Sequence, residues 1–193
     1  GKMSSREGKV ILGEWLIDEI TKKVSILMKD FKKEDKEETV KKITISAIKY
    51  AFLKTGIKND IKFDLDESVS LSGDSGPYLL YIVARIKSIL NKAGKIDKKI
   101  TVPEKVLDPE KQLLLKLSKF NETIINSAKS NDPSKIARYL FDLAQNFNSF
   151  YDKCPVLKST GKQKQFRLQI IQKVEKTMQQ GLYLLGIDTV EKM

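Results

Sequence analysis

The stretch from Leu71 to Leu90, LSGDSGPYLLYIVARIKSIL, constrains the fold of this chain more than any other. It opens as a glycine-rich turn, SGDSG, in which the two glycines permit backbone angles that other residues resist. Asp74 or Ser75 can cap a following helix, and Pro77 suits a first helical turn. The sequence therefore predicts a turn that runs directly into a helix.

The predicted helix has two distinct faces. At about 100° per residue, an apolar face combines Leu79, Ile82, Val83, Ile86 and Leu90. A second, exposed stripe carries Tyr78, Tyr81, Arg85 and Ser88. Aromatic planes and a guanidinium can stack on a nucleobase. From periodicity alone, an alternative stays open, in which the tyrosines are half-buried core residues and the arginine is a solvated charge.

The same stretch resembles the signature helix of arginyl-tRNA synthetases, which lies in their carboxy-terminal helical anticodon-binding domain. The common family form is close to GnTGPYLQYAyARi.SIl. This chain departs from it at 74–75, where Asp-Ser replaces Asn/Asp-Thr, at Leu80, which replaces Gln, and at 82–83, where Ile-Val replaces Ala-Tyr/His. The stripe of two tyrosines and an arginine is unchanged.

Composition narrows the choice of partner and chemistry. The 193 residues, 40% of them hydrophobic, suffice for about one domain with a real core. A net charge of +11 favours a polyanionic partner, although lysine excess alone is weak evidence, since only four of the 36 basic residues are arginine. No histidine and a single cysteine, Cys154, exclude a Ser-His or Cys-His pair, a histidine-ligated zinc site and an internal disulfide. We expect a cytoplasmic chain without a membrane span or signal peptide.

The first eight residues, GKMSSREG, form a polar segment bounded by glycines. They resemble the KMSKS-type loop of class I synthetases in its arginyl version, with serine in place of the second lysine. In a full-length parent, the resemblance implies that this loop contacts the phosphates of ATP, bound with Mg²⁺, through Lys2, Met3, Ser4, Ser5 and Arg6. The nucleotide fold is missing, so we expect a piece of a longer enzyme that is inactive alone and needs no cofactor.

Apolar periodicity and capping signals predict the remaining elements. Helices are expected over 14–31, 36–55 and 76–93, then from Asp108, after Asn131-Asp132-Pro133, and over 165–185. The segment 59–69 alternates apolar and charged residues and predicts a short strand. Its acidic spacing lacks the glycine and distal glutamate of a calcium loop, so no metal site is expected. The fold class is all-α, an antiparallel helical bundle.

The resemblance extends from Lys2 to Met193. The segment 138–157 resembles the family's YLydLA..fn.fY....Vl element, and GIDTVEKM reproduces the family's ending. It implies two parts: residues 1–33 are the tail of a class I catalytic region, and 34–193 are the anticodon-binding domain. It also implies an anticodon-binding set of Tyr78, Tyr81, Arg85, Tyr151 and Met193, with Ser72 and Asp74 as further candidates.

The predicted function is the anticodon-binding part of an arginine–tRNA ligase, whose full-length parent attaches arginine to tRNA with ATP. The predicted partner is arginine tRNA, and the predicted state is a monomer. Two alternatives stay open: a stand-alone RNA-binding helical module without ligase activity, and a helical protein-interaction domain whose basic surface serves solubility.

Overall fold

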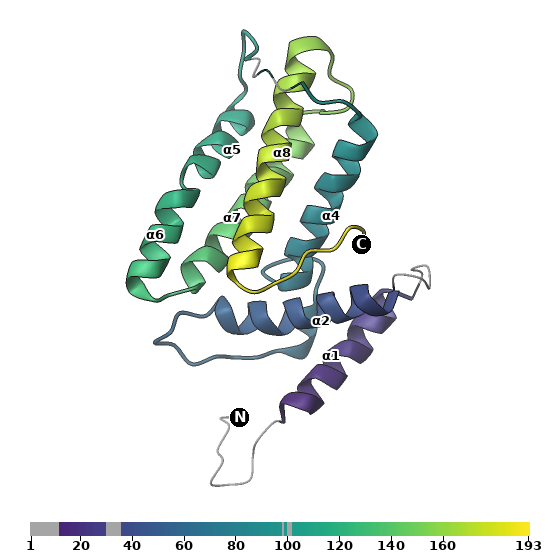
Figure 1. Ribbon diagram of the computed structural model, residues 1–193, viewed down its shortest axis with the longest axis vertical. Coiled ribbons are helices and arrows are strands. Elements are labelled where there is room, and N and C mark those ends of the chain that lie inside the picture. Colours follow the sequence, from purple (N-terminus) through teal and green to yellow (C-terminus); the bar gives the residue numbers. More distant parts are fainter. Residues whose placement is uncertain (1–11, 30–35, 98, 100–101) are drawn as a thin grey trace.

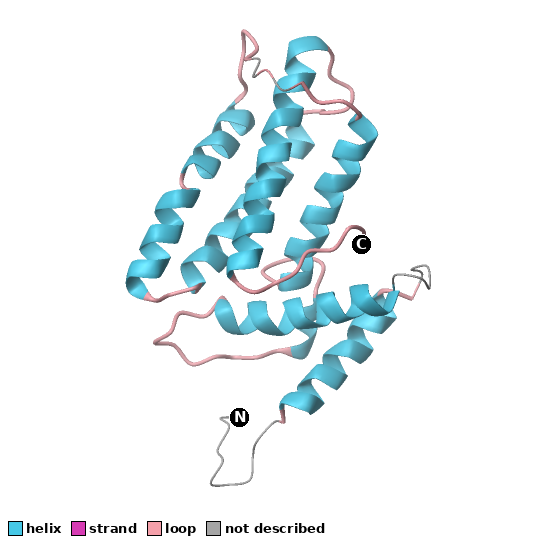
Figure 2. Ribbon diagram, in the orientation of Figure 1, coloured by secondary structure: helices cyan, strands magenta, loops and turns pink. Residues whose placement is uncertain are grey.

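The computed structural model describes residues 12–29, 36–97, 99 and 102–193. Every regular element among them is a helix (Figure 2). The eight helices are α1 (Gly13–Leu27), α2 (Lys36–Leu53), α3 (Leu65–Val69), α4 (Gly76–Ala93), α5 (Asp108–Ser118), α6 (Phe120–Ser130), α7 (Ser134–Lys153) and α8 (Gly161–Leu184). The predicted all-α fold class is therefore confirmed.

Helices α4 to α8 form an up-and-down bundle, and α1, α2 and the short α3 lie outside it (Figure 1). In that view α4 and α7 run upward, whereas α5, α6 and α8 run downward. α5 packs against α7 and α4 against α8, while α2 crosses the lower end of the bundle with α1 beneath it. The core is filled by fully buried side chains from several helices, among them Tyr50, Leu79, Leu113, Leu140, Phe147 and Val174.

The predicted strand over 59–69 is wrong. Residues 60–64 are irregular, and α3 follows, because Asp64 caps it: the Asp64 carboxylate accepts hydrogen bonds from the backbone N–H groups of Asp66 (2.9 Å) and Glu67 (2.8 Å). The Phe63 ring stacks on Phe52 of α2, with ring centroids 5.6 Å apart. The alternation thus reflects a loop lying against a helix and a capping aspartate, not the pleat of a sheet.

The long helix expected after Asp108 is divided at Lys119 into α5 and α6. The buried stripe nevertheless continues across this division, since Leu113, Phe120 and Ser127 are all buried at helical spacing, whereas Leu114 is 39% exposed. In α6 the buried residues are Phe120 and Ser127, and the Ser127 hydroxyl donates to the Asp132 carbonyl at 2.7 Å. Helix α5 begins at Asp108, as the sequence predicted. The backbone N–H of Leu107 is satisfied by the Glu110 carboxylate at 2.7 Å.

Candidate functional site

The turn before α4 fixes where that helix begins. The Ser75 hydroxyl accepts a hydrogen bond from the Tyr78 backbone N–H at 3.1 Å, so Ser75 is the cap. Gly73 has φ +84°, which favours glycine. A Cβ on Gly76 would lie 2.3 Å from the Ser46 carbonyl oxygen, so only glycine lets α4 start this close to α2. The predicted turn-to-helix junction is confirmed, and contact with α2 holds it.

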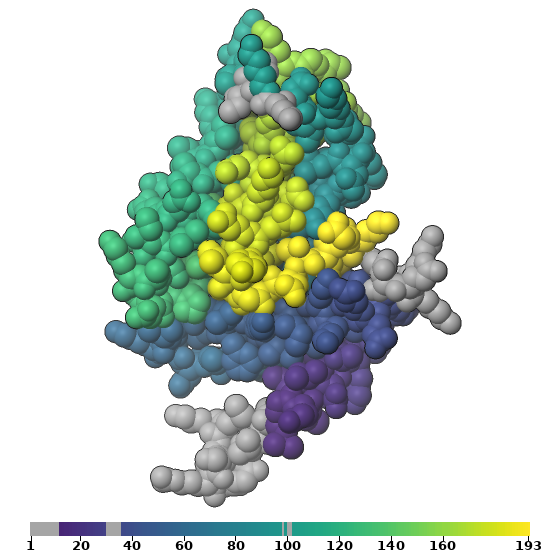
Figure 3. All heavy atoms as spheres, in the orientation of Figure 1, coloured from purple at the N-terminus to yellow at the C-terminus, as the bar shows by residue number. Residues whose placement is uncertain are grey.

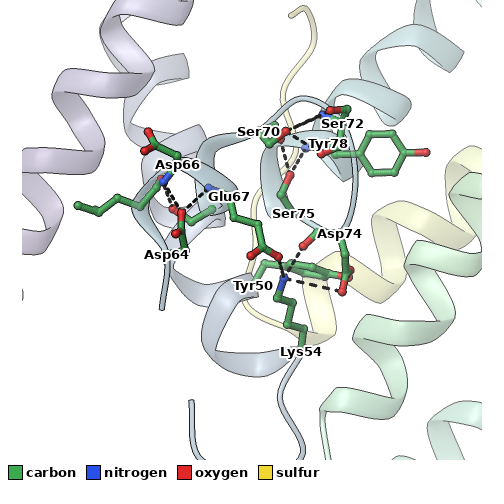
Figure 4. A network of polar contacts seen from close by, with 12 residues as sticks. Tyr50, Lys54, Asp64, Asp66, Glu67, Ser70, Ser72, Asp74, Ser75 and Tyr78 are labelled. Atoms are coloured by element: carbon green, nitrogen blue, oxygen red, sulfur yellow. Dashed lines mark hydrogen bonds and ion pairs between the residues drawn. The ribbon is translucent and has the colours of Figure 1, made fainter. Parts of the chain in front are cut away.

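Asp74, a candidate for contacting RNA, is engaged by the protein itself (Figure 4). Its carboxylate accepts a hydrogen bond from the buried Tyr50 hydroxyl at 2.6 Å, and its carbonyl accepts one from Lys54 Nζ at 2.7 Å. Burial, followed by the neighbouring Asp74 carboxylate, raises the pKa of Tyr50 well above its ordinary value. Ser72 is exposed, and its backbone N–H donates to the Ser70 hydroxyl at 3.1 Å.

Away from this turn, Tyr78, Arg85, Asn148 and Tyr151 form what we call the α4/α7 cluster. The Arg85 guanidinium carbon lies 4.6 Å from the centroid of the Tyr151 ring. Arg85 Nη1 donates to Asn148 Oδ1 at 3.4 Å, and Asn148 Nδ2 donates to the Tyr78 hydroxyl at 2.9 Å. The structure therefore brings Tyr151 close to two residues that precede it by 66 or more positions in the sequence, Tyr78 and Arg85.

Burial differs within the cluster. Tyr78 is only 7% exposed and meets Phe141 edge-on at 6.1 Å, so the expectation that it forms part of an exposed stripe is wrong. Figure 4 shows its ring pointing away from the serine-rich turn. Arg85, Asn148 and Tyr151 are half-buried. Burial raises the pKa of the Tyr78 hydroxyl, while Arg85 and the hydrogen bond from Asn148 lower it, so the hydroxyl stays protonated at neutral pH.

Among the described residues, Tyr81 and Met193 make none of the contacts that define the α4/α7 cluster. Tyr81 is half-buried one turn after Tyr78 and packs against the core. The last residues, yellow in Figure 3, run between α4 and α2, where Lys87 Nζ donates to the Val190 carbonyl at 3.4 Å and pairs with Glu191 at 2.5 Å. Met193 is half-buried against the core. Within the described ranges, no hydrogen bond, ion pair or ring contact links it to the α4/α7 cluster.

Sequence reasoning missed Asn148. It lies three residues before Tyr151, and residues at that spacing are neighbours on one face of a helix. Asn148 lies in FNSFY, within the segment 138–157 that resembles the family pattern, and this position could have identified it as a site residue. Chemically, the α4/α7 cluster offers a flat aromatic face, a cation and guanidinium N–H groups that no acceptor in the described ranges pairs, at a half-buried surface. Such a surface suits a planar ligand with hydrogen-bond acceptors.

Three further predictions concern the KMSKS-like segment, metal binding and membrane spans. Lys2, Met3, Ser4, Ser5 and Arg6 lie outside the described residues. In the described ranges, no group of three or more acidic or cysteine side chains is arranged to hold a metal ion. None of the described helices is long and apolar enough to cross a membrane.

The chain is similar in sequence and in structure to known proteins. Residues 79–193 match the family model described as the DALR anticodon binding domain. Curated relatives include arginine–tRNA ligases of Pyrobaculum aerophilum, 36% identical over all of this chain and 30% of the relative, and of Streptomyces coelicolor, 39% identical over 98% and 33%. The solved arginyl-tRNA synthetase of Thermus thermophilus superposes with a TM-score of 0.88 at 33% identity, over 96% of this chain and 33% of that one.

The chain thus spans about a third of the length of the curated relatives that it matches. The matched region begins within α4 and includes α7, so three members of the α4/α7 cluster, Arg85, Asn148 and Tyr151, fall inside it. Because the family match extends over well more than half of the residues, this chain belongs to the family of the DALR anticodon binding domain.

Proposed function

We propose that this chain is the anticodon-binding part of an arginine–tRNA ligase and that it binds the anticodon loop of arginine tRNA. The observation that supports this most directly is the α4/α7 cluster, in which a half-buried arginine lies over a tyrosine ring within a region matched to the anticodon-binding family. Both curated relatives described above are arginine–tRNA ligases, which points to arginine tRNA as the partner.

The chemistry of an anticodon loop fits this surface. Its bases are unstacked, and proteins read such bases by stacking and by hydrogen bonds to their edges. Tyr151 with Arg85 supplies a stacking face, Tyr78 a hydroxyl, and Tyr81 a second aromatic plane on the same helix. Tyr151 and Met193 would close the pocket for the central anticodon base, and the turn that contains Ser72 would contact neighbouring bases through backbone groups. The net charge of +11 would add salt-dependent phosphate contacts that carry no sequence information.

The full-length parent would attach arginine to tRNA with ATP and Mg²⁺. In that parent Lys2, Met3, Ser4, Ser5 and Arg6 would form a KMSKS-like loop at the ATP phosphates, ahead of the anticodon-binding domain at 34–193. The amine of Lys2, the hydroxyls of Ser4 and Ser5 and the guanidinium of Arg6 can all donate hydrogen bonds to phosphate oxygens. We expect the parent to work as a cytoplasmic monomer, and this chain to contribute tRNA binding without chemistry.

The decisive test titrates the chain with an arginine-tRNA anticodon stem-loop and with the same stem-loop altered at its central anticodon base, at two salt concentrations. We expect tighter binding to the unaltered loop, and a preference that persists as salt rises, because base contacts are less salt-dependent than phosphate contacts. Equal binding to both loops that falls with salt would contradict anticodon recognition. It would instead favour a basic RNA-binding module without base selection.

Tyr81→Ala tests the stacking contribution by itself. Losing one stacked base should weaken binding of the stem-loop by about 1–3 kcal/mol and leave helix content unchanged by circular dichroism. Tyr183→Ala is the matched control, because Tyr183 is 77% exposed at the end of α8 and outside the proposed site. If both variants bind as the wild type does, Tyr81 does not contact RNA.

A further inference from the structure

We propose that Asn148 is a positioning residue of the anticodon-binding site: its side-chain amide turns the Tyr78 hydroxyl so that this hydroxyl donates its hydrogen to an acceptor on a nucleobase. This inference rests on the proposed function and deepens it, because it assigns a polarity to the binding site. The site would accept base edges that present a carbonyl or an unprotonated ring nitrogen.

The orientation of the Asn148 amide follows from its neighbour. An arginine guanidinium has only donors, so the group that Asn148 turns toward Arg85 must be its carbonyl oxygen, and Oδ1 lies 3.4 Å from Arg85 Nη1. The amide nitrogen then faces Tyr78, and Nδ2 lies 2.9 Å from the hydroxyl oxygen. Because the amide nitrogen can only donate, the Tyr78 hydroxyl must be the acceptor of that bond.

The hydroxyl hydrogen of Tyr78 is therefore left over. In the part of the chain that the structure describes, no protein group accepts it. The buried ring, held against Phe141, keeps the hydroxyl in place, and its neighbours Arg85, Asn148 and Tyr151 are half-buried and so reach the surface. A ligand that enters here meets the hydroxyl hydrogen of Tyr78 and those N–H groups of Arg85 that no acceptor among the described residues takes up. A base with a donor at this position would leave two donors facing each other.

Tyr50 is an example in the same molecule of a tyrosine whose hydroxyl hydrogen is bonded within the protein. Its hydroxyl donates to the Asp74 carboxylate at 2.6 Å, so its hydrogen is spent within the protein. The difference lies in the partner, since a carboxylate accepts whereas the nitrogen of an amide donates. Replacing Asn148 by aspartate should therefore give Tyr78 the same bonding as Tyr50.

The experiment compares Asn148→Asp with Gln145→Glu, measuring affinity for the arginine-tRNA anticodon stem-loop. Aspartate has the shape of asparagine and still accepts from Arg85, but it also accepts from Tyr78 and turns the hydroxyl hydrogen inward. Gln145 is exposed one turn earlier on α7, so Gln145→Glu adds the same charge on the same helix without touching the cluster. We expect Asn148→Asp to bind roughly threefold to tenfold more weakly than Gln145→Glu, the equivalent of one hydrogen bond.

Tyr78→Phe, made in both backgrounds, separates positioning from a merely structural role. With Asn148 present, removing the hydroxyl should weaken binding roughly threefold to tenfold, because a hydrogen bond to the base is lost. With aspartate at 148, the same change should have less than about a twofold effect, because the hydroxyl no longer serves the ligand. If Asn148→Asp proves unfolded by circular dichroism, Asn148→Ala takes its place, and the effect of Tyr78→Phe should again shrink.

The outcomes distinguish the two proposals. If the wild-type chain does not discriminate between the unaltered and the altered stem-loop, the proposed function and this inference are both overturned. If it discriminates but Asn148→Asp binds as Gln145→Glu does, or if Tyr78→Phe has the same effect in both backgrounds, only the role of Asn148 is overturned.

Discussion

Arg167 and Arg85 lie in two helix contacts of one bundle and differ in how far the protein satisfies their donors. Arg167, on α8, is 6% exposed; its Nε donates to the Glu110 carboxylate and its Nη1 to the Ser159 hydroxyl, both at 2.6 Å. Arg85, on α4, is half-buried, and its nearest partners are an amide oxygen at 3.4 Å and the Tyr151 ring at 4.6 Å.

The difference teaches which arginine serves the fold and which is available to a ligand. A guanidinium removed from water needs a carboxylate and further acceptors to offset its desolvation, and the surroundings of Arg167 provide them from α5 and the loop before α8. Arg85 stays partly exposed to water, and within the part of the chain that the structure describes its one hydrogen bond is to Asn148. Both residues are rare arginines in a lysine-rich chain, yet only the packing around them separates their roles.

The largest expected effect is the loss of stability on breaking the Arg167 contact. Glu110→Ala should lower the free energy of unfolding by about 3–5 kcal/mol, because it leaves the buried Arg167 guanidinium without its countercharge. Asp108→Ala is the matched control on the same helix, since the Asp108 side chain is 91% exposed, and it should cost less than about 1 kcal/mol. Denaturant unfolding measures both. If the two variants lost equal amounts of unfolding free energy, the buried Glu110 carboxylate would contribute no more to stability than the exposed Asp108 carboxylate.

A smaller effect, on binding and not on folding, is expected for Arg85→Ala. Removing the cation above Tyr151 should weaken binding of the anticodon stem-loop by about 1–3 kcal/mol. The free energy of unfolding should change by no more than about 1 kcal/mol, because the contact is half-exposed. Isothermal titration and denaturant unfolding on one preparation give the two numbers. A large loss of stability would place Arg85 with Arg167 and break the comparison.

The smallest expected effect is on how the free energy of unfolding depends on pH. It concerns the Tyr50 hydroxyl, which is hydrogen-bonded within the protein to Asp74. The pKa of Tyr50 is raised by burial and then by Asp74, so the folded state retains a proton that the unfolded chain releases near pH 10. The contribution of Tyr50 to stability is thus complete below pH 10 and declines as pH rises above it. Between pH 8 and 11, the free energy of unfolding should fall less steeply with pH for Tyr50→Phe than for the wild type.

Identical slopes for Tyr50→Phe and the wild type would contradict that coupling. The comparison of the two proteins cancels the lysines, which titrate in the same range in both. Tyr50→Phe should also lower stability at neutral pH by about 1–3 kcal/mol, because the Asp74 carboxylate and the Ala137 carbonyl lose a buried donor.

The sequence predicted well wherever local periodicity and caps govern the backbone. The apolar face of α4 is buried as expected at Leu79, Ile82 and Val83, because helical spacing alone decides which side chains share a face. Prediction failed where a neighbour decides. The segment 59–69 became a loop and α3 because Asp64 caps and Phe63 packs on Phe52, and the break between α5 and α6 at Lys119 has no signal in the local periodicity.

For the candidate site, the sequence by itself determined the residue types and their helices: Tyr78, Tyr81 and Arg85 on one helix and Tyr151 on another. Only the tertiary structure decided that Arg85 lies over Tyr151, that Asn148 joins Arg85 to Tyr78, and that Tyr78 is buried. The physical reason is that local spacing sets which residues share a helix face. Burial and hydrogen-bond polarity instead depend on side chains that arrive from distant parts of the chain.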